Sequence, residues 1–246
     1  MSSEVLSWFR KKEIAAQTPI RTDVHSHLLP GLDDGVQSFE DAEAIILRFI
    51  QAGYQKLITT PHIMSDAYRN TPDGIRASLA ELNNYLKNKN IHIQLEAAAE
   101  YYLDEAFFKS IELNQEVLTF GKNYLLFETN FMTEPLQLKE FIFMATTRGY
   151  QLVLAHPERY LYLQNDLTKA EDLINRGVCF QLNTSSLTGY YSREAQRTAF
   201  KLIDNGWIHF LGSDCHSLQH VHLLEEAQRS RYYQKALTLP LLNNNL

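Results

Sequence analysis

The sequence predicts an α/β fold, a single-domain barrel in which parallel strands alternate with helices. Three observations lead to this prediction. The chain has 246 residues, about the length of one β/α barrel. Short apolar runs alternate with helix-like stretches about seven times. Polar side chains end most of these runs, which is where a barrel gathers its catalytic residues.

The strands are predicted from short runs with few charges inside them, as expected for strands buried on both faces of a parallel sheet. In order along the chain, the runs are TDVHSH, KLITTPH, IQLEAAAEYY, NYLLFETNF, QLVLAHPER, CFQLNTSSL and IHFLGSDCH.

The helices are predicted from apolar residues that recur at helical spacing between these runs. The predicted helices cover residues 39–53, 74–89, 135–148, 168–176, 192–205 and 219–235. Four glycines end helix-like segments shortly before the next strand, as is typical of helix C-termini: Gly53, Gly149, Gly177 and Gly206. No linker rich in Pro, Gly or Ser divides the chain, so one barrel domain is expected over residues 21–246.

Residues 1–20 are predicted to form a helical extension before the barrel. Val5, Leu6, Trp8 and Phe9 would make its apolar face. Packing of this face on the barrel or on a neighbouring subunit, which would make a homo-oligomer, is favoured over contact with a membrane surface. The N-terminus lacks the apolar core of a signal peptide, and no stretch approaches the roughly 18 to 20 apolar residues of a membrane span.

Net charge and cysteine content limit which binding partners and which cellular compartment are expected. The net charge of −6 offers no broad basic surface, so nucleic acid is not an expected partner. Cys179 and Cys215 are too few for a disulfide framework and suit a reducing compartment, so the cytoplasm is expected. A cysteine phosphatase is excluded, because its C-x5-R loop needs arginine where Ser185 and Val221 stand.

Side chains that commonly bind metal end six of the predicted strands. They are His25, His27, His62, Glu100, Glu128, His156, Asp214 and His216. Alternate residues of a strand point to the same side, so His25 and His27 present two imidazoles to one place. Asp33 and Asp34 follow the first strand in a glycine-flanked loop near the same mouth, where either carboxylate could add a ligand.

Each of these features alone has an ordinary structural explanation. An isolated His-x-His pair arises by chance or for packing, and a lone His62 or His156 at a strand end is more often a hydrogen-bonded core residue. Glu100 and Glu128 differ, because a carboxylate that ends an apolar strand is costly to bury unless it is paired or binds metal. The joint pattern, repeated on six strands, favours a metal site.

The donor set predicts both the ions and the reaction. Imidazoles with carboxylates and no thiolate set suit Zn, Mn, Fe or Co, and the number of candidates implies two or three divalent ions. Such ions lower the pKa of a bridging water and neutralise phosphoryl oxygens during in-line attack. The sequence therefore predicts a metal-dependent phosphoesterase that uses a metal-bridged hydroxide.

Basic and aromatic residues near the strand ends are candidates for substrate contact. Arg159 offers a planar fork to a phosphate, and the alternative is an ion pair with a structural carboxylate such as Glu158. Arg69 and Arg193 are weaker candidates, because an ordinary solvated arginine is the favoured explanation for each. Three tyrosines would flank an aromatic substrate unless they pack in the core or at the rim: Tyr68, Tyr101 and Tyr102.

The motifs DVHSHLLPGLDDG, TPH, AAAEYY, FETNF, LAHPERY and GSDCHS resemble, in this order, those of the polymerase-and-histidinol-phosphatase (PHP) superfamily. More narrowly, the chain resembles the CpsB/CapC/YwqE-type bacterial tyrosine-protein phosphatases, which are linked to capsular and exopolysaccharide synthesis. The aspartate in HSHLLPGLDDG is typical of this narrower family. The resemblance covers the chain from about residue 22 to about residue 240 and implies a distorted (β/α)7 TIM-like barrel, the PHP fold.

The resemblance also implies roles for the site residues. Three ions would be held by His25, His27, Glu100 and Asp214, by Asp34, His62 and His216, and by Glu128 and His156. Glu100 would bridge two of them. Arg159 would bind the phosphate and act in catalysis together with His156 and Asp34. Manganese is the expected ion, with Fe, Co, Zn and Mg as alternatives.

The substrates implied by the resemblance are phosphotyrosines of a protein, namely a tyrosine kinase that controls capsular or exopolysaccharide synthesis. One alternative keeps the site but takes a small ester, such as histidinol phosphate or a sugar phosphate. Another is a metal-bearing regulatory protein without turnover. Amidohydrolase activity is disfavoured, because those enzymes usually have a carboxylated lysine bridge and no lysine ends a strand here.

Overall fold

The computed structural model describes residues 19–246 of the chain. The predicted helix at residues 5–9 lies outside the described residues. The helical extension over residues 1–20 and its boundary with the barrel therefore stay predictions. Within the described part, no helix combines the length and the apolar character needed to span a lipid bilayer.

The strands of the described part form two parallel sheets, with the orders β1-β2-β4 and β3-β5-β6-β7-β8-β9. They are β1 (Thr22–Asp23), β2 (Lys56–Thr59), β3 (His62–Ile63), β4 (Gln94–Ala97), β5 (Glu100–Tyr102), β6 (Tyr124–Glu128), β7 (Gln151–Ala155), β8 (Cys179–Asn183) and β9 (Phe210–Gly212). All of them lie within the seven predicted runs except that β3 extends one residue beyond its run, to Ile63. The second run is interrupted between β2 and β3, and the third between β4 and β5. The predicted α/β fold of parallel strands is confirmed.

Backbone hydrogen bonds join the two sheets at both sides. Near the chain ends, Asp214 N–H donates to the His25 carbonyl over 2.8 Å and His27 N–H donates to the Cys215 carbonyl over 2.9 Å. On the other side, Glu100 N–H in β5 donates to the carbonyl of Pro61, which lies between β2 and β3, over 3.1 Å. The first and last strand regions of the chain are therefore neighbours.

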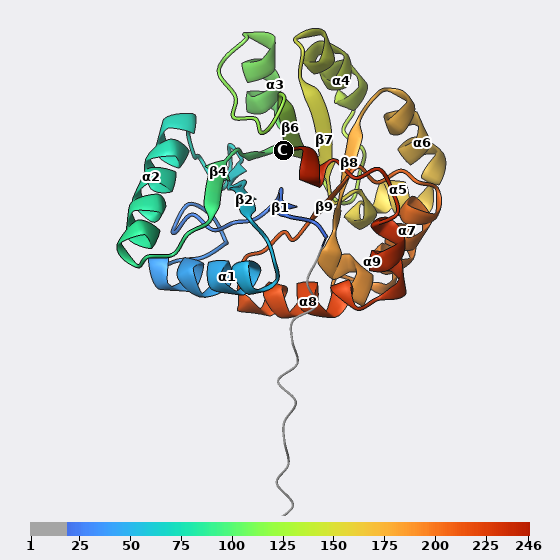
Figure 1. Cartoon of the computed structure of the whole chain (residues 1–246). Coiled ribbons are helices and arrows are strands. Elements are labelled where there is room, and N and C mark those ends of the chain that lie inside the picture. Colours follow the sequence, from blue (N-terminus) through green and yellow to red (C-terminus); the bar gives the residue numbers. More distant parts are fainter. Residues whose placement is uncertain (1–18) are drawn as a thin grey trace, which may run out of the picture.

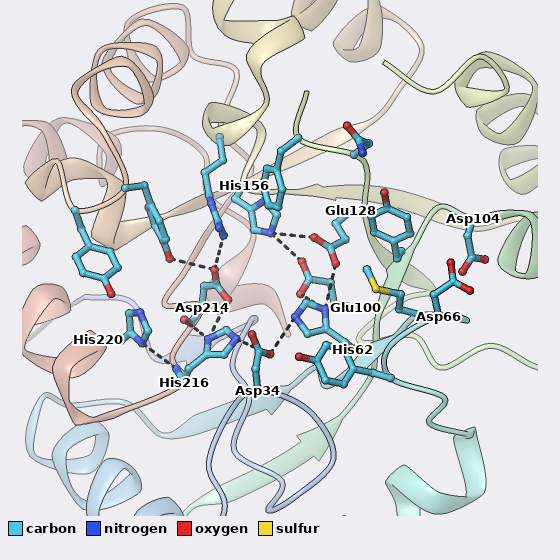
Figure 2. A pocket seen from close by; sticks show the side chains of 18 residues that line it. Asp34, His62, Asp66, Glu100, Asp104, Glu128, His156, Asp214, His216 and His220 are labelled. Carbon is cyan, nitrogen blue, oxygen red and sulfur yellow. Dashed lines mark hydrogen bonds and ion pairs between the residues drawn. The ribbon is translucent and has the colours of Figure 1, made fainter. Parts of the chain in front are cut away.

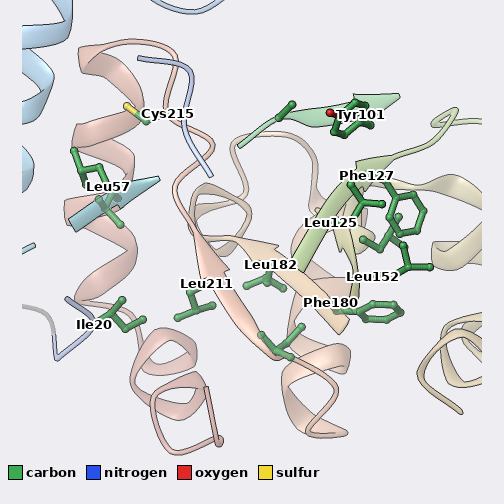
Figure 3. Close-up of a cluster of buried hydrophobic side chains, with 14 of the residues drawn as sticks. Ile20, Leu57, Tyr101, Leu125, Phe127, Leu152, Phe180, Leu182, Leu211 and Cys215 are labelled. Carbon is green, nitrogen blue, oxygen red and sulfur yellow. The ribbon is translucent and has the colours of Figure 1, made fainter. Parts of the chain in front are cut away.

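Two apolar clusters occupy opposite faces of the strands, as the alternation of strand side chains requires. The smaller cluster faces inward and comprises Val24, Ile58, Ala98, Phe120, Leu126, Val153, Ala155 and Phe210. The larger cluster packs the outer faces against the helices and includes Leu57, Leu125, Leu152 and Leu182 (Figure 3). Cys215 also belongs to this outer cluster.

Helices surround the strands (Figure 1). They are α1 (Phe39–Gln51), α2 (Pro72–Asn88), α3 (Glu105–Glu112), α4 (Leu138–Thr147), α5 (Leu161–Asn165), α6 (Leu167–Asn175), α7 (Arg193–Asp204), α8 (Leu218–Gln228) and α9 (Arg231–Ala236). Short 3-10 helices are η1 (Pro157–Arg159), η2 (Thr184–Thr188) and η3 (Asn243–Asn245). The predicted helices are present, and α3 and α5 are additional.

One predicted helix boundary is wrong. The segment 219–235 forms two helices instead of one, because Ser230 has extended backbone and its hydroxyl accepts a hydrogen bond from Tyr233 N–H, which starts α9. The glycine predictions are confirmed: Gly53, Gly149 and Gly177 have φ of 94°, 86° and 84°, and Gly206 has φ of 71°. A left-handed backbone at these positions ends each helix and costs glycine no steric strain.

Candidate metal centre

The side chains predicted as metal ligands converge at the C-terminal ends of the strands (Figure 2). Asp34, His62, Glu100, Glu128, His156, Asp214 and His216 line a cavity of about 950 Å³. His25 and His27 are fully buried and contact the carboxylates of Glu100 and Asp214. The structure thus brings all nine residues to one place, and their role as ligands stays a prediction.

The donor atoms fall into three overlapping groups, each with its atoms within 4.8 Å of one another. The groups are His25, His27 and Glu100; His27, Asp34, His62 and His216; and His62, Glu100 and Glu128. Glu100 and two imidazoles belong to more than one group. This overlap is the geometry expected of ions that share ligands. It differs from the predicted grouping, because His62 and Glu100 accompany Glu128 in place of His156, and His156 and Asp214 belong to none of the three groups.

Hydrogen bonds determine which ring nitrogen of His25 and His27 carries a proton. His25 Nδ1 lies 2.7 Å from Gln181 Oε1, an acceptor because the amide nitrogen of Gln181 donates to Asn183 Oδ1. His27 Nδ1 lies 2.7 Å from the Asp33 carboxylate. Both Nδ1 atoms therefore donate, which leaves the Nε2 lone pair of each neutral ring for the cavity side.

The two Nε2 atoms meet a cluster that consists of acceptors. They lie 3.2 Å apart, and His25 Nε2 is 3.1 Å from Glu100 Oε2 and 3.3 Å from Asp214 Oδ1. Lone pairs and carboxylate oxygens at such distances repel one another unless a cation lies among them. The residues present therefore fit divalent metal ions, which favour imidazole nitrogen together with carboxylate oxygen.

The charges around the cluster favour positive charge on its members. Burial lowers the pKa of His25, but Glu100 and Asp214 outweigh this effect and raise it to about 9. Burial raises the pKa of Glu100, yet the charges of His25 and His62 hold it well below its usual value. The carboxylates thus attract either protons or metal ions, and metal binding has to displace protons.

His62 and His156 each have a buried Nδ1 atom that makes no hydrogen bond with any described residue. His62 Nδ1 nevertheless lies 3.2 Å from Glu100 Oε2 and 3.2 Å from Glu128 Oε1. His156 Nε2 lies 2.9 Å from Glu100 Oε1. Burial and the charge of Arg159 lower the pKa of His156, which keeps its imidazole neutral.

The structure separates the roles of the two neighbouring aspartates. Asp33 is buried, and its carboxylate accepts from His27 Nδ1, from Gly35 N–H over 2.9 Å and from His62 N–H over 3.0 Å. Asp34 instead faces the cavity. Its Oδ1 lies 3.6 Å from His62 Nε2 and 3.4 Å from His216 Nε2. Asp33 orients a candidate ligand, whereas Asp34 is placed to be one.

Arg159 lies at the cavity wall between two aromatic rings. Its guanidinium carbon is 4.7 Å from the centre of the Phe131 ring and 4.1 Å from that of Tyr191. Its Nη1 donates to Asp214 Oδ2 over 3.1 Å. Glu158 is not its ion-pair partner, since that buried side chain accepts from Ser186 Oγ and from Asn183 N–H.

Two candidate ligands sit on strained backbone. His156 has φ of 35° and Asp214 has φ of 50°, in the left-handed region that non-glycine residues rarely adopt. His156 directly follows β7, and Asp214 lies two residues after the end of β9. Such strain persists only where the surroundings hold it, and it is common at functional sites.

The other predicted substrate contacts divide into two sets. Tyr68 and Tyr102 line the cavity, whereas Tyr101 is buried in the core, where its hydroxyl accepts from Leu118 N–H. Arg69 and Arg193 are exposed and do not line the cavity. Arg69 Nε donates to the Ser65 carbonyl, beside a separate hollow of about 330 Å³.

Five further residues contribute to the site without having been predicted. Gln181 and Asn183 hold His25 and Asp214, and Phe131 and Tyr191 enclose Arg159. His220 lines the cavity, and its Nδ1 accepts from His216 N–H. The one available signal was in the run CFQLN, where two amides alternate inside an otherwise apolar strand.

The family model and the relatives that match this chain all belong to one family. The model of the family described as capsular polysaccharide synthesis, CpsB/CapC, matches residues 21–235. CapC of Staphylococcus aureus is 27% identical over 219 residues, which cover 87% of this chain and 86% of CapC. YwqE of Bacillus subtilis, named a tyrosine-protein phosphatase, is 25% identical over 80% of this chain and 78% of its own.

Solved structures share the fold. One from a study of YwqE of Bacillus subtilis and CpsB of Streptococcus pneumoniae, described as metal-dependent tyrosine phosphatases, superposes with a TM-score of 0.79. It is 24% identical and covers 89% of this chain and 90% of its own. An inactive dihydroorotase-like domain of Chaetomium thermophilum has a TM-score of 0.51 at 14% identity, covering 85% of this chain and 67% of its own.

Proposed function

The chain belongs to the CpsB/CapC family of capsular polysaccharide synthesis, and we propose that it is a metal-dependent phosphatase that hydrolyses phosphotyrosine in proteins. The family resemblance read from the motifs is thereby confirmed. The activity is the one named for the relatives YwqE and CpsB. A residue-level argument for it comes from the cavity itself.

The observation that carries the proposal is the convergence of acceptor atoms without matching donors. Imidazole nitrogens of His25 and His27 and carboxylate oxygens of Glu100 and Asp214 meet within 3.1–3.5 Å. His25, His27, Glu100 and Asp214, with Asp34, His62, Glu128, His156 and His216, would hold two or three divalent ions. Bound ions would lower the pKa of a water molecule and neutralise the oxygens of a phosphoryl group.

Arg159 binds and orients the phosphoryl group in this proposal. Its Nη1 is tied to Asp214, and the rings of Phe131 and Tyr191 fix the plane of the guanidinium. The N–H groups of Nη2 make no hydrogen bond within residues 19–246 and are free to donate to phosphate oxygens. A preorganised donor of this kind acts without reorganisation as charge develops.

Asp34 and His156 act at the two sides of the cavity. A hydrogen bond with His216 outweighs burial and lowers the pKa of Asp34, so its carboxylate stays ionised at neutral pH. Its Oδ2 can accept a hydrogen bond from the attacking water and orient that molecule. His156 stays neutral and presents its nitrogen toward Glu100.

An aryl phosphate suits this set of residues better than an alkyl phosphate. The phenol released from phosphotyrosine has a pKa of about 10, so it leaves with little help from a proton donor. An alcohol such as histidinol is a far poorer leaving group. Because ions bound to the imidazole lone pairs would displace the ring protons, few proton donors would remain at the cavity centre, and phosphotyrosine is the better match.

The same proposal names the native ion and the substrate protein. Manganese is proposed as the native ion, because imidazoles mixed with several carboxylates suit a harder ion than a thiolate site does. A tyrosine kinase of polysaccharide synthesis is proposed as the substrate protein, in line with the description of the family. The two free cysteines support a cytoplasmic location. A homo-oligomer stays a prediction.

The test is phosphate release from a tyrosine-phosphorylated peptide and from a panel of small phosphate esters that includes histidinol phosphate and a sugar phosphate. The apoprotein is reconstituted with divalent Mn, Co, Fe, Zn or Mg in turn. We expect hydrolysis of the peptide to exceed that of the alkyl esters and to be lost with chelator. Arg159→Lys should lower kcat on the order of a hundredfold while metal content stays normal.

The matched controls separate binding of metal from turnover. His156→Ala should reduce both metal content and activity, whereas Arg159→Lys should reduce activity alone. Preference for an alkyl ester would replace phosphotyrosine by a small metabolite as substrate. Stoichiometric metal binding without hydrolysis of any ester would overturn the proposed enzyme and favour a binding protein.

A further inference from the structure

Exposed apolar side chains gather in the β6–α4 loop, residues 129–137, which follows the C-terminal end of a strand. Three of the exposed large apolar side chains within the described residues belong to this loop: Phe131, Met132 and Leu136. Met132 is 65% exposed, and Leu136 is fully exposed. Loops after the strands lie on the face of a β/α barrel that holds the catalytic residues. Phe131 lines the cavity, and Met132 and Leu136 follow it in the same loop, where they line a neighbouring hollow of about 590 Å³.

The loop is held in place by hydrogen bonds. The Asn130 side chain accepts from Met132 N–H over 2.8 Å and from Thr133 N–H over 3.1 Å. The Phe131 carbonyl accepts from Leu161 N–H over 2.8 Å, which ties the loop to α5. Met132 and Leu136 are thus presented to solvent by an ordered turn, although exposing them costs hydrophobic free energy.

The same loop is part of the cavity wall. Asn130 and Phe131 line the cavity, and the Phe131 ring packs against the Arg159 guanidinium and lies 5.6 Å from the His156 ring, centre to centre. The apolar surface is therefore continuous with the candidate metal centre. Two more exposed apolar residues, Tyr190 and Leu218, lie in the segments that follow β8 and β9 on the same face.

Charge at this rim is already neutralised within the chain. Glu134 lies in the loop between Met132 and Leu136, and its carboxylate pairs with Lys169 Nζ over 2.7 Å. Lys139, one turn further on, lies 3.4 Å from Asp172. A partner that covers this rim consequently gains from apolar contact and not from ion pairing.

We propose that the β6–α4 loop binds apolar residues of the polypeptide that flanks the phosphotyrosine. The inference rests on the proposed function. When the phosphoryl group of a phosphotyrosine lies among the candidate ligands, the aromatic ring spans the cavity and the substrate main chain lies at the rim. A small ester would stay inside the cavity and leave Met132 and Leu136 uncovered.

The experiment compares three substrates on the metal-loaded full chain. They are free phosphotyrosine, a peptide with one phosphotyrosine flanked by leucines, and the same peptide with serines in place of the leucines. We expect the natural chain to prefer the leucine-flanked peptide by about fivefold in kcat/KM. The double variant Met132→Ser, Leu136→Ser should lose that preference and hydrolyse free phosphotyrosine as before.

Leu113→Ser is the matched control, because Leu113 is 58% exposed but lies at the C-terminal end of α3, on the face of the barrel opposite to the loops that follow the strands. It should keep the preference. Equal rates on both peptides in the natural chain would overturn the inference, as would a preference that survives the double variant or disappears in the control. Failure of the natural chain to hydrolyse any of the three substrates would instead overturn the proposed function itself.

Discussion

The two carboxylate oxygens of Asp214 have different partners. Its Oδ2 accepts hydrogen bonds from Arg159 over 3.1 Å, from Asn183 over 2.6 Å and from Tyr191 over 3.2 Å. Its Oδ1 faces His25 and His27. Three donors on one oxygen fix the carboxylate plane, so the other oxygen is held toward the candidate ions.

Gln181 has a comparable supporting task for His25. Replacing it with methionine, which is similar in size, removes the acceptor for His25 Nδ1 and releases the ring to rotate or to change tautomer. We expect Gln181→Met to weaken binding of the ions about 10- to 100-fold, although no ligand is lost. Competition with a chromogenic chelator measures this affinity.

A suitable comparison for that variant is Gln181→Glu, which keeps an oxygen acceptor near His25 Nδ1. Its loss of affinity should be smaller. If the methionine variant bound ions as tightly as the natural chain, His25 would not depend on this hydrogen bond, and the supporting role would have to be withdrawn.

Among the elements, β8 contributes no candidate ligand and yet supports the site. Gln181 and Asn183 alternate along it and point inward, and they connect His25 to Asp214. The strand lies between β7 and β9, which lead to His156 and Asp214. It therefore serves as a polar scaffold within an otherwise apolar barrel.

The loop between β1 and α1 depends on a close approach of its backbone to the first strand region. A methyl group added at Gly35 would collide with the His27 carbonyl oxygen and Cβ, which are not free to move. We expect Gly35→Ala to lower the free energy of unfolding by about 1–3 kcal/mol and to weaken ion binding, since His27 and Asp33 would shift. Urea unfolding and chelator competition measure the two effects.

Gly74→Ala is the appropriate control for that substitution. Gly74 lies in the first turn of α2, where an added methyl group meets only the Thr71 hydroxyl, 3.2 Å away. The free energy of unfolding of the Gly74→Ala variant should stay within about 1 kcal/mol of that of the natural chain. Equal effects of the two substitutions would contradict the steric argument for Gly35.

At the scale of the whole molecule, the candidate ligands come from both ends of the described chain and from the strands between them. His25 and Asp214 are far apart in sequence but are joined by backbone hydrogen bonds beside the ring of ligands. Ions bound there would hold segments together that separate on unfolding. Metal binding and folding should therefore be coupled.

We expect removal of the ions to lower the thermal midpoint. At a free ion concentration of 100 times the dissociation constant, binding stabilises the folded chain by about 2.7 kcal/mol, equivalent to several degrees for a domain of this size. Calorimetric scans with and without chelator measure the shift. Glu100→Gln, which weakens the shared carboxylate, should show a much smaller shift; identical midpoints for the natural chain in both conditions would contradict the coupling.

Much of the fold and many site residues could be predicted from local features of the sequence. The alternation of apolar runs with helical periods depends on neighbouring residues only, and so do the glycines that end helices. Ligand-type residues such as His62 and Glu128 stand out because a polar side chain at the end of an apolar strand is costly without a partner. These features are readable without knowing which strands are adjacent.

The roles of several site residues depend instead on contacts between distant parts of the chain. Residue pattern left Asp33 and Asp34 equivalent and only the family resemblance favoured Asp34, because the choice depends on which carboxylate reaches His27 and His62 after the loop folds back. Nor could the sequence tell that Arg159 pairs with Asp214. Sequence thus determined the kinds of donor atoms and the strands that carry them, whereas tertiary structure decided their orientation, because hydrogen bonds between strands fix each ring and carboxylate.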